Sequence, residues 1–376
     1  MLDKGNFYKD VTICIIEACN LNCTYCYENH KSHRKMTFNT LKEIIDREIY
    51  NYKSDGFKGI TFNLFGGEAF LYFQIIKEVV EYLESTYPQS SGYDWICFIT
   101  TNGTLVHNEI QEWLITHKKS IVCGLSLDGT KKCHDLNRSN SFDLIDIDFF
   151  KKLYPEQTVK MTISQETLPY LCECVVFAHE SGFKVSCNLA FNIDWSKESN
   201  EKVLYDQLME LISFYLSNPD IEPCSLLSGN LYKIAKGEKE TYRECGAGQS
   251  GMCSYDVDGN KYPCQFFMPI SIGNELSEKS KCIDWHDKII PFDKLDARCH
   301  DCVLKSNCHI CYGANYAATG NIFLHEENWC KLNKLTFKAR AFFKIKQYEQ
   351  GISLGNEFET KLTLKNALLV LEEVTI

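Results

Sequence analysis

The sequence predicts an α/β fold in which a partial (β/α)6 TIM barrel is followed by a small cysteine-rich region and a C-terminal helix. The first observation is a regular alternation of short apolar runs with amphipathic stretches between residues 11 and 190, which indicates parallel strands joined by right-handed helical crossovers. The second is a segment after residue 245 that is dense in cysteine, glycine and asparagine and has little periodicity. Six strand–helix units can be counted, which is fewer than a complete eight-fold barrel requires.

Each predicted strand is short, largely apolar and followed by a polar or glycine-containing turn, as strands buried in a parallel sheet are. The six runs are residues 11–16, 60–65, 94–99, 121–127, 159–164 and 185–191. Two apolar stripes between these runs predict helices. The first stripe contains Leu71, Ile75, Ile76, Val79, Val80 and Leu83, and the second contains Ile110, Trp113 and Leu114. Further helices are expected over residues 198–218 and 332–347.

The chain is expected to have three parts. Residues 1–223 form the barrel core with its connecting helix, residues 224–350 form the cysteine-rich domain, and residues 351–376 form a tail that no pattern assigns to an element. The cysteine-rich segment cannot bury enough apolar surface by itself, so we expect metal to hold it together.

Composition and charge exclude several classes of protein. A formal net charge of −10 provides no electrostatic footprint for nucleic acid. The N-terminus (MLDKGNFYKD) lacks the apolar run of a secretory signal, and no stretch approaches the ~18 apolar residues of a membrane span. We therefore expect a cytoplasmic protein. Because a reducing compartment does not favour disulfides, the 20 cysteines indicate metal binding.

Three cysteines follow the first predicted strand directly. Cys19, Cys23 and Cys26 form a C-x3-C-x2-C loop, and each thiolate can hold one iron of a 4Fe–4S cluster. The fourth iron then has no protein ligand, and an open coordination position is where a substrate binds. The alternative is a zinc knuckle, for which the nearest additional ligands are His30 and His33.

This loop, with Tyr25 before its last cysteine, closely resembles the signature of the radical SAM superfamily. Three further motifs resemble that family in the same order: Gly66-Gly67-Glu68 after the second strand, Thr101-Asn102 at the end of the third, and Ser126 and Asp128 at the end of the fourth. Glycines let a backbone approach a ligand closely, a carboxylate suits an ammonium, and open α/β sheets bind ligands at these strand ends. The resemblance implies that S-adenosyl-L-methionine (SAM) is bound by Tyr25, Gly66, Gly67, Glu68, Thr101, Asn102, Ser126 and Asp128.

The resemblance also implies the chemistry. A reduced cluster passes one electron into the SAM sulfonium, the C5′–S bond breaks, and a 5′-deoxyadenosyl radical abstracts hydrogen from an unactivated C–H bond. The electron would come from a donor such as flavodoxin or ferredoxin. A non-catalytic iron–sulfur electron carrier or a zinc-stapled binding module is the alternative of another class, and neither would need the SAM motifs.

The later cysteines resemble a SPASM domain, which carries two auxiliary 4Fe–4S clusters. The resemblance implies Cys245, Cys253, Cys264 and Cys311 as ligands of one cluster and Cys299, Cys302, Cys308 and Cys330 as ligands of the other. The last pair is C-x2-C, where the family usually has C-x3-C. On spacing alone, the paired C-x2-C units could equally form a zinc ribbon. If Cys253 is not a ligand, the first auxiliary cluster keeps an open iron for a substrate thiolate.

The other nine cysteines fall mostly in strand or helix patterns and are expected to pack in the core as small apolar residues. They are Cys14, Cys97, Cys123, Cys133, Cys172, Cys174, Cys187, Cys224 and Cys282.

The two-part resemblance implies a peptide or protein substrate. We expect a maturase of ribosomally made peptides that forms a thioether or carbon crosslink, and the alternative is an anaerobic sulfatase maturase that forms formylglycine. In sulfatase maturases an aspartate follows the cysteine of the G-x4-C motif; here that position is Gln265, and an amide cannot act as a base. Asp256 or Asp258 could replace it. Because only about ten residues precede the first strand, the small leader-recognition domain that many peptide maturases carry there is expected to be absent or to be a separate protein.

Overall fold

The protein is described by a computed structural model that covers residues 7–191, 193–236, 241–242, 245–285, 289–290, 294–308 and 311–375. The chain divides into two compact units. The first unit comprises residues 1–127, 138–159 and 246–285, and the second comprises residues 128–137, 160–245 and 286–376. In the described residues, no helix is both long and apolar enough to cross a membrane.

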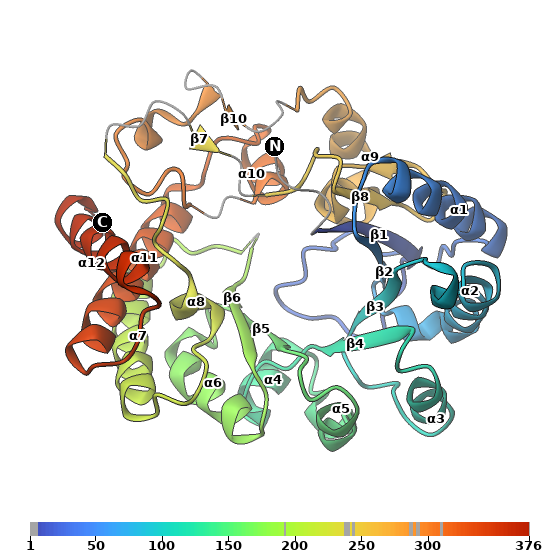
Figure 1. The fold of residues 1–376 in the computed structure, drawn as a ribbon, viewed down its shortest axis with the longest axis horizontal. Helices are drawn as coiled ribbons and strands as arrows, with labels where there is room; N and C mark the ends of the chain where they lie inside the picture. The colour runs from blue at the N-terminus through green and yellow to red at the C-terminus, as the bar shows by residue number, and fades with distance from the viewer. Residues whose placement is uncertain are drawn as a thin grey trace. The chain divides into compact units, whose positions relative to one another are not determined.

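The first unit is built on a six-stranded sheet in the order β4-β3-β2-β1-β8-β9 (Figure 1). Its strands are β1 (Tyr8–Ile16), β2 (Gly59–Gly66), β3 (Trp95–Thr101), β4 (Ile121–Leu125), β8 (Met252–Tyr255) and β9 (Lys261–Tyr262). All neighbouring strands run parallel except β9, which pairs with β8 in an antiparallel hairpin. The apolar run from Ile13 to Ile16 in β1 is almost fully buried, as expected for a strand with neighbours on both edges and cover on both faces.

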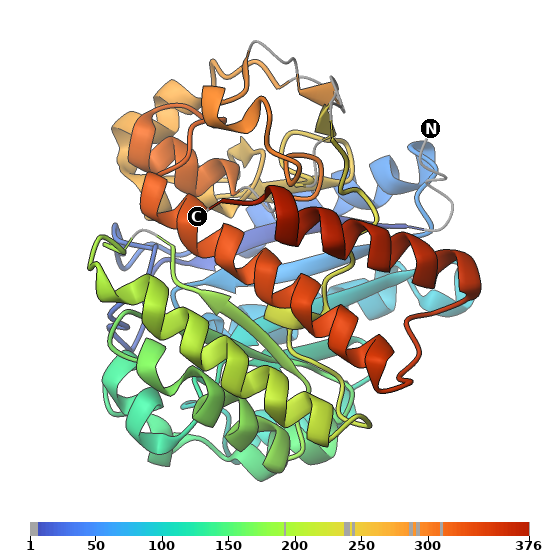
Figure 2. The same ribbon diagram turned by 90° about the vertical axis from the view of Figure 1, so that its left-hand side faces the viewer.

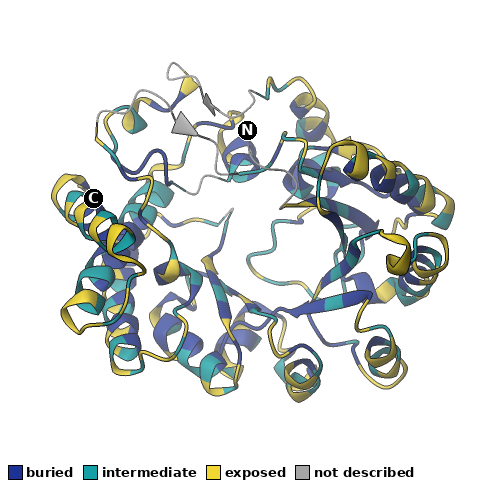
Figure 3. Ribbon diagram, viewed as in Figure 1, coloured by how far each residue is buried: buried dark blue, intermediate teal, exposed yellow. Residues whose placement is uncertain are grey.

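The first unit also contains helices, and the two longest of them each bury an apolar stripe. They are α1 (Phe38–Ser54), α2 (Phe73–Thr86), α3 (Glu109–Thr116), α5 (Ile147–Leu153) and α9 (Pro269–Ser280). In α2 the buried side chains are Ile75, Ile76, Val79, Val80 and Leu83, so the predicted stripe is confirmed except for Leu71, which lies in the preceding short 3-10 helix η2 (Ala69–Tyr72). Figure 3 shows the exposed faces of α1 and α2 turned away from the sheet.

The second unit contains the remaining strands and helices. They are α4 (Lys131–Asn137), β5 (Val159–Ile163), α6 (Leu171–Glu180), β6 (Val185–Leu189), α7 (Ser199–Ser217), α8 (Ser225–Ser228), β7 (Thr241–Tyr242), β10 (Ile289–Ile290), α10 (Tyr312–Thr319), α11 (Glu327–Glu349) and α12 (Glu357–Glu373). β5 pairs with β6, and β7 pairs with β10. Figure 2 shows α11 lying between α7 and α12. All six predicted strands are therefore present, and the α/β fold class is confirmed.

Two segments differ from the sequence-based expectation. Residues 252–255, expected to be irregular, form β8 and pair in parallel with β1. Residues 357–373, left as an unassigned tail, form α12. Its start is fixed by a capping box in which Asn356 accepts from the Glu359 backbone and the Glu359 carboxylate accepts from the Asn356 backbone.

Phe337 lies at the centre of an apolar cluster that joins α11 to α12 in the second unit. Its side chain is fully buried among residues that include Leu231, Ala367 and Val370. We expect Phe337→Ala to lower the free energy of unfolding by about 3–5 kcal/mol, because the cavity cannot close on a side chain this large. Urea unfolding followed by circular dichroism would measure the loss. A change below about 1 kcal/mol would contradict this packing.

Candidate functional site

The loop that follows β1 carries Cys19, Cys23 and Cys26, all half-buried. The loop turns tightly, since the Cys26 amide donates to the Cys23 carbonyl at 3.2 Å. Lys31 Nζ donates to Cys26 Sγ at 3.0 Å, and the Leu21 amide donates to Cys19 Sγ at 3.4 Å. Burial raises the pKa of Cys19 to about 11, so a metal that binds this thiol must displace its proton.

Gly66 and Gly67 bring the end of β2 against the backbone that precedes this loop. The Gly67 amide donates to the Ile16 carbonyl at 3.2 Å, and the next amide donates to the Ala18 carbonyl at 3.0 Å. A Cβ on Gly67 would lie 2.4 Å from the Ala18 oxygen and 2.8 Å from Cys19 Cβ, and one on Gly66 would lie 2.1 Å from the Ile16 oxygen. The two glycines therefore permit close approach to the chain's own cysteine loop.

Glu68 is a buried carboxylate at the edge of this loop, with only 2% of the residue exposed. Its Oε1 accepts from Thr101 Oγ1 at 2.8 Å and from the Phe70 amide at 3.2 Å, while Oε2 accepts from the Asn102 amide at 2.8 Å. Burial nevertheless raises the pKa of Glu68. A cationic ligand beside the carboxylate would offset the cost of burying its charge.

A ring of polar side chains ties the cysteine loop to the end of β3. Asn102 Nδ2 donates to Asn20 Oδ1 at 2.9 Å, and Asn20 Nδ2 donates to Thr104 Oγ1 at 2.8 Å. Thr104 Oγ1 closes the ring by donating to Asn102 Oδ1 at 2.7 Å. Asn102 is therefore placed to hold the loop. The sequence analysis missed Asn20, whose only signal was its place inside the cysteine motif.

Two further contacts hold the same loop from the segment after α4. The Asn22 amide donates to Ser139 Oγ at 3.0 Å. The Arg138 guanidinium lies 5.4 Å from the centroid of the Tyr25 ring, within the range of a cation–π contact. Ser139 and Asn140 both have positive φ values, 57° and 55°, which turn the chain sharply at this point. Tyr25 therefore helps to position the loop.

Comparisons with known proteins agree with this geometry. Residues 13–145, which include the cysteine loop, Glu68 and Asn102, match the Radical SAM superfamily. Residues 13–145 form a radical SAM domain.

Two characterised relatives are similar over most of the chain. The cysteine-type anaerobic sulfatase-maturating enzyme of Clostridium perfringens strain 13 is 26% identical over 339 residues, which cover 78% of this chain and 86% of the relative. The radical SAM cyclopropyl synthase TigE of Paramaledivibacter caminithermalis is 21% identical over 363 residues, which cover 90% of this chain and 75% of the relative.

Solved structures share the fold. Native anSMEcpe with bound AdoMet aligns with a TM-score of 0.66 at 19% identity and covers 92% of this chain and 100% of that one. The same protein with bound AdoMet and the Cp18Cys peptide aligns with a TM-score of 0.65, 19% identity and coverage of 92% and 99%. The partial-barrel fold class is thereby confirmed.

The residues of the radical SAM domain fit the two groups that such a domain uses. Cys19, Cys23 and Cys26 offer three thiols for an iron–sulfur cluster, and Lys31 places a positive charge against one of them. Glu68 offers a buried carboxylate that is oriented by three donors and is suited to the SAM ammonium.

Ser126 and Asp128 lie at the end of β4, in different units. In the first unit, the Ser126 amide donates to the Thr101 carbonyl at 2.9 Å. In the second, the Asp128 carboxylate is fully buried and accepts from the Thr162 amide at 2.9 Å and from Asn137 Nδ2 at 3.1 Å. Asp128 thus fixes α4 against β5, a structural role that the sequence analysis did not foresee.

In the second unit, four cysteines interact electrostatically with one another: Cys299, Cys302, Cys308 and Cys330. Burial, the Asp296 carboxylate and the Cys302 and Cys330 thiols raise the pKa of Cys299 to about 12. Asn333 Nδ2 donates to Cys308 Sγ at 3.0 Å. Within the described part of the chain, no group of three or more His, Cys, Asp or Glu residues is placed to hold a single metal ion.

Of the other four predicted auxiliary ligands, two lie in each unit. In the second unit, the Cys245 thiol interacts electrostatically with Cys311, whose Sγ accepts from the Ala314 amide at 3.4 Å at the start of α10. In the first unit, Cys253 lies in β8 and Cys264 follows β9. Cys253 lines a cavity of about 490 Å³, and Lys261 and Lys281 line the same cavity.

The segment that carries Cys264 packs against the cysteine loop within the first unit. Tyr27 stacks on Phe266, with ring centroids 4.1 Å apart and planes 18° apart. The His30 amide donates to the Ile270 carbonyl at 3.0 Å. Phe266 and Phe267 are both buried, so these aromatic side chains belong to the packing between the two segments.

Asp256 has a structural role. Its Oδ1 accepts from the amides of Asp258 and Asn260, and its Oδ2 accepts from Asn260 Nδ2 and Tyr262 Oη. The carboxylate thus holds the turn between β8 and β9, where Gly259 has a φ of +83°. Asp258 pairs with Arg34. Both carboxylates considered as substitutes for a base at Gln265 are therefore engaged.

Eight of the nine cysteines expected in the core are buried. Cys282 is exposed, so that prediction was wrong at this position. It follows α9, where the turn directs it to solvent.

Proposed function

We propose that the protein is a radical SAM maturase that modifies a side chain of a ribosomally made peptide, forming a thioether or carbon crosslink. The observation that carries this proposal is the amide of Gln265 in the position of a proton-accepting aspartate, together with the engagement of Asp256 and Asp258 elsewhere. Crosslinking removes one hydrogen atom and then one further electron and one proton from the substrate. The hydrogen atom would go to the 5′-deoxyadenosyl radical and the electron to an auxiliary cluster, and an attacking thiol can release its proton to water because its ordinary pKa is about 8.5, so a carboxylate base is not required.

The residues described above have distinct roles in this proposal. Cys19, Cys23 and Cys26 hold a 4Fe–4S cluster, and Glu68 binds the SAM ammonium. Asn102, through Asn20, keeps the loop in position. When bound, cluster and SAM supply a radical that abstracts a hydrogen atom from the substrate.

We further propose two auxiliary 4Fe–4S clusters in a SPASM domain, held by the eight cysteines named for them. The cavity beside Cys253 and the proximity of Cys299, Cys302, Cys308 and Cys330 support this assignment. The proposed partners are a leader-bearing precursor peptide and an electron donor such as flavodoxin or ferredoxin; a separate leader-recognition protein is a further candidate.

Formation of formylglycine is the second candidate. It is favoured by the similarity to the sulfatase-maturating enzyme of Clostridium perfringens, which extends over 86% of that protein. It is disfavoured by Gln265, since a neutral amide does not accept a proton at neutral pH.

Anaerobically reconstituted protein is expected to convert SAM to 5′-deoxyadenosine when a reductant is present. Co-expression with a cysteine-containing precursor encoded nearby should yield a peptide that has lost two hydrogens per crosslink, measured by mass spectrometry. Replacement of a cysteine sulfur by oxygen together with the loss of two hydrogens would instead identify formylglycine. Absence of 5′-deoxyadenosine would contradict radical SAM activity itself.

A further inference from the structure

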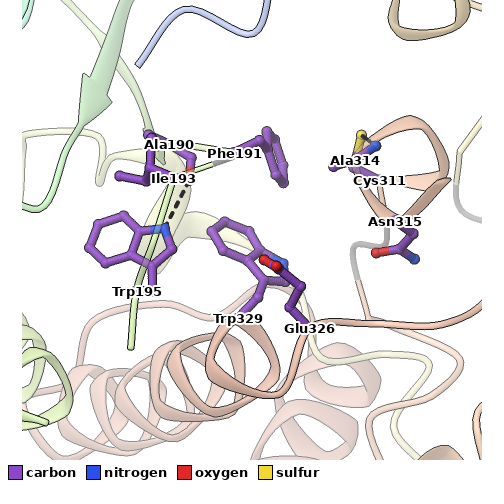
Figure 4. Close-up of a pocket in the computed structure, with 9 residues that line it drawn as sticks. All are labelled: Ala190, Phe191, Ile193, Trp195, Cys311, Ala314, Asn315, Glu326 and Trp329. Atoms are coloured by element: carbon purple, nitrogen blue, oxygen red, sulfur yellow. Dashed lines mark hydrogen bonds between the residues drawn. The ribbon is translucent and has the colours of Figure 1, made fainter. Parts of the chain in front are cut away.

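A pocket in the second unit contains one proposed cluster ligand, Cys311, and its other lining residues have no role in the proposed function. It lies where the chain leaves β6, facing the start of α10 and α11 (Figure 4). Aromatic side chains form two of its walls. Phe191 and Trp329 have ring centroids 4.8 Å apart, and Trp195 is fixed by a hydrogen bond of 3.0 Å from its indole Nε1 to the Ala190 carbonyl.

Acceptor groups line the same pocket. Asn315 is only 6% exposed, and its Nδ2 donates to the Ile322 carbonyl at 2.9 Å. That bond fixes the orientation of the amide, so Oδ1 is an acceptor to which no described residue donates. The Glu326 carboxylate, at the start of α11, also has no hydrogen-bond or ion-pair partner among the described residues.

The charge of the pocket selects the kind of ligand. Of the described residues that line it, Glu326 has the only charged side chain, and the charge is negative. Aromatic faces attract cations, and a carboxylate with an amide oxygen provides acceptors for an N–H donor. The cavity volume is about 20 Å³, which admits a group the size of one water molecule. A primary ammonium has that size, whereas a planar guanidinium is larger.

We infer that this pocket binds the ammonium of a lysine side chain in the peptide substrate, with Glu326 and Asn315 as acceptors and Trp329 against the cation. Cys311 lines the same pocket, so this lysine would be held beside a proposed auxiliary ligand. The inference rests on the proposed function, because it presumes a peptide substrate. It adds a sequence requirement that the radical chemistry does not impose.

Affinity selection tests the inference. The anaerobically reconstituted holoenzyme is incubated with short synthetic peptides of random sequence, and the retained peptides are sequenced by mass spectrometry. We expect lysine to be enriched over arginine, and Glu326→Gln to reduce the lysine enrichment about fivefold to tenfold. Butylammonium should compete with the retained peptides, and butanol, which has the same chain without the charge, should not.

Glu327→Gln is the matched control, since it removes the same charge one residue away. Glu327 pairs with Lys331 at 3.4 Å and does not line the pocket, so lysine enrichment should persist. No lysine enrichment, or equal enrichment in wild type and Glu326→Gln, would overturn the inference. SAM cleavage without peptide is measured on the same preparation, so loss of radical chemistry is distinguished from loss of lysine selection.

Discussion

Replacing Gly67 with alanine is expected to prevent the cysteine loop from holding its cluster. The new Cβ would lie 2.4 Å from the Ala18 oxygen and 2.8 Å from Cys19 Cβ. Both neighbours belong to the backbone or to the base of a side chain, so neither can rotate away, and the loop itself must shift. A displacement of about 1 Å at a reacting centre costs about 100-fold in rate, so 5′-deoxyadenosine formation should fall at least that far.

Iron content and the electron paramagnetic resonance spectrum of the reduced protein are the direct measurements for Gly67→Ala. The SAM-sensitive signal should disappear, while the iron of the two proposed auxiliary clusters should remain. Gly251→Ala is the control in the same unit, because its Cβ would meet only the Phe57 ring at 3.4 Å, an ordinary contact. Wild-type iron content and spectrum in Gly67→Ala would contradict the close approach of β2 to the loop.

Glu68→Gln is expected to weaken SAM binding and to destabilise the radical SAM domain together. Each carboxylate oxygen accepts a backbone N–H, one from Phe70 and the other from Asn102. A glutamine has a single oxygen, so in either orientation its amide nitrogen would face a backbone donor. We expect a loss of about 2–3 kcal/mol in the free energy of unfolding and a rise in the SAM dissociation constant of about tenfold or more.

Thermal unfolding and equilibrium dialysis of SAM would measure the two effects of Glu68→Gln. Glu84→Gln is the matched control: Ser120 and His117 both bond to Glu84 Oε1, so a glutamine oxygen can replace it. If Glu68→Gln and Glu84→Gln behave alike in both measurements, the hydrogen bonds described at Glu68 do not hold the carboxylate in place.

Local sequence patterns were sufficient to predict most of the fold and the types of side chain that the site contains. The six strands are apolar runs, and the α2 stripe has helical spacing, so each carries its own signal. The capping box of Asn356 and Glu359 was also a local signal, and it could have identified α12. The exposed position of Cys282 had no such signal, because it depends on how the turn after α9 is directed.

Other features depend on neighbours that are distant in the sequence. β8 is too short to show alternation, and its place is set by pairing with β1. Asn20 holds the cysteine loop only because Thr104 lies within hydrogen-bond distance of it. Asp256 holds the turn between β8 and β9 only because that turn brings the Asn260 amide to its carboxylate. The Gly66-Gly67 motif was interpreted as an approach to a ligand, and the structure adds that it brings the end of β2 against the backbone at Ile16 and Ala18.

The parallel pairing of β1 with β8 has a consequence during synthesis. β1 is complete at residue 16, yet the strand that covers its second edge begins only at residue 252. At about 5–20 residues per second, a ribosome needs on the order of tens of seconds to make the intervening chain. Throughout that interval, the second edge of β1 has no partner strand, so its backbone donors and acceptors are unpaired. Unpaired strand edges of this kind promote aggregation. A fragment that stops near residue 223 would keep that edge permanently.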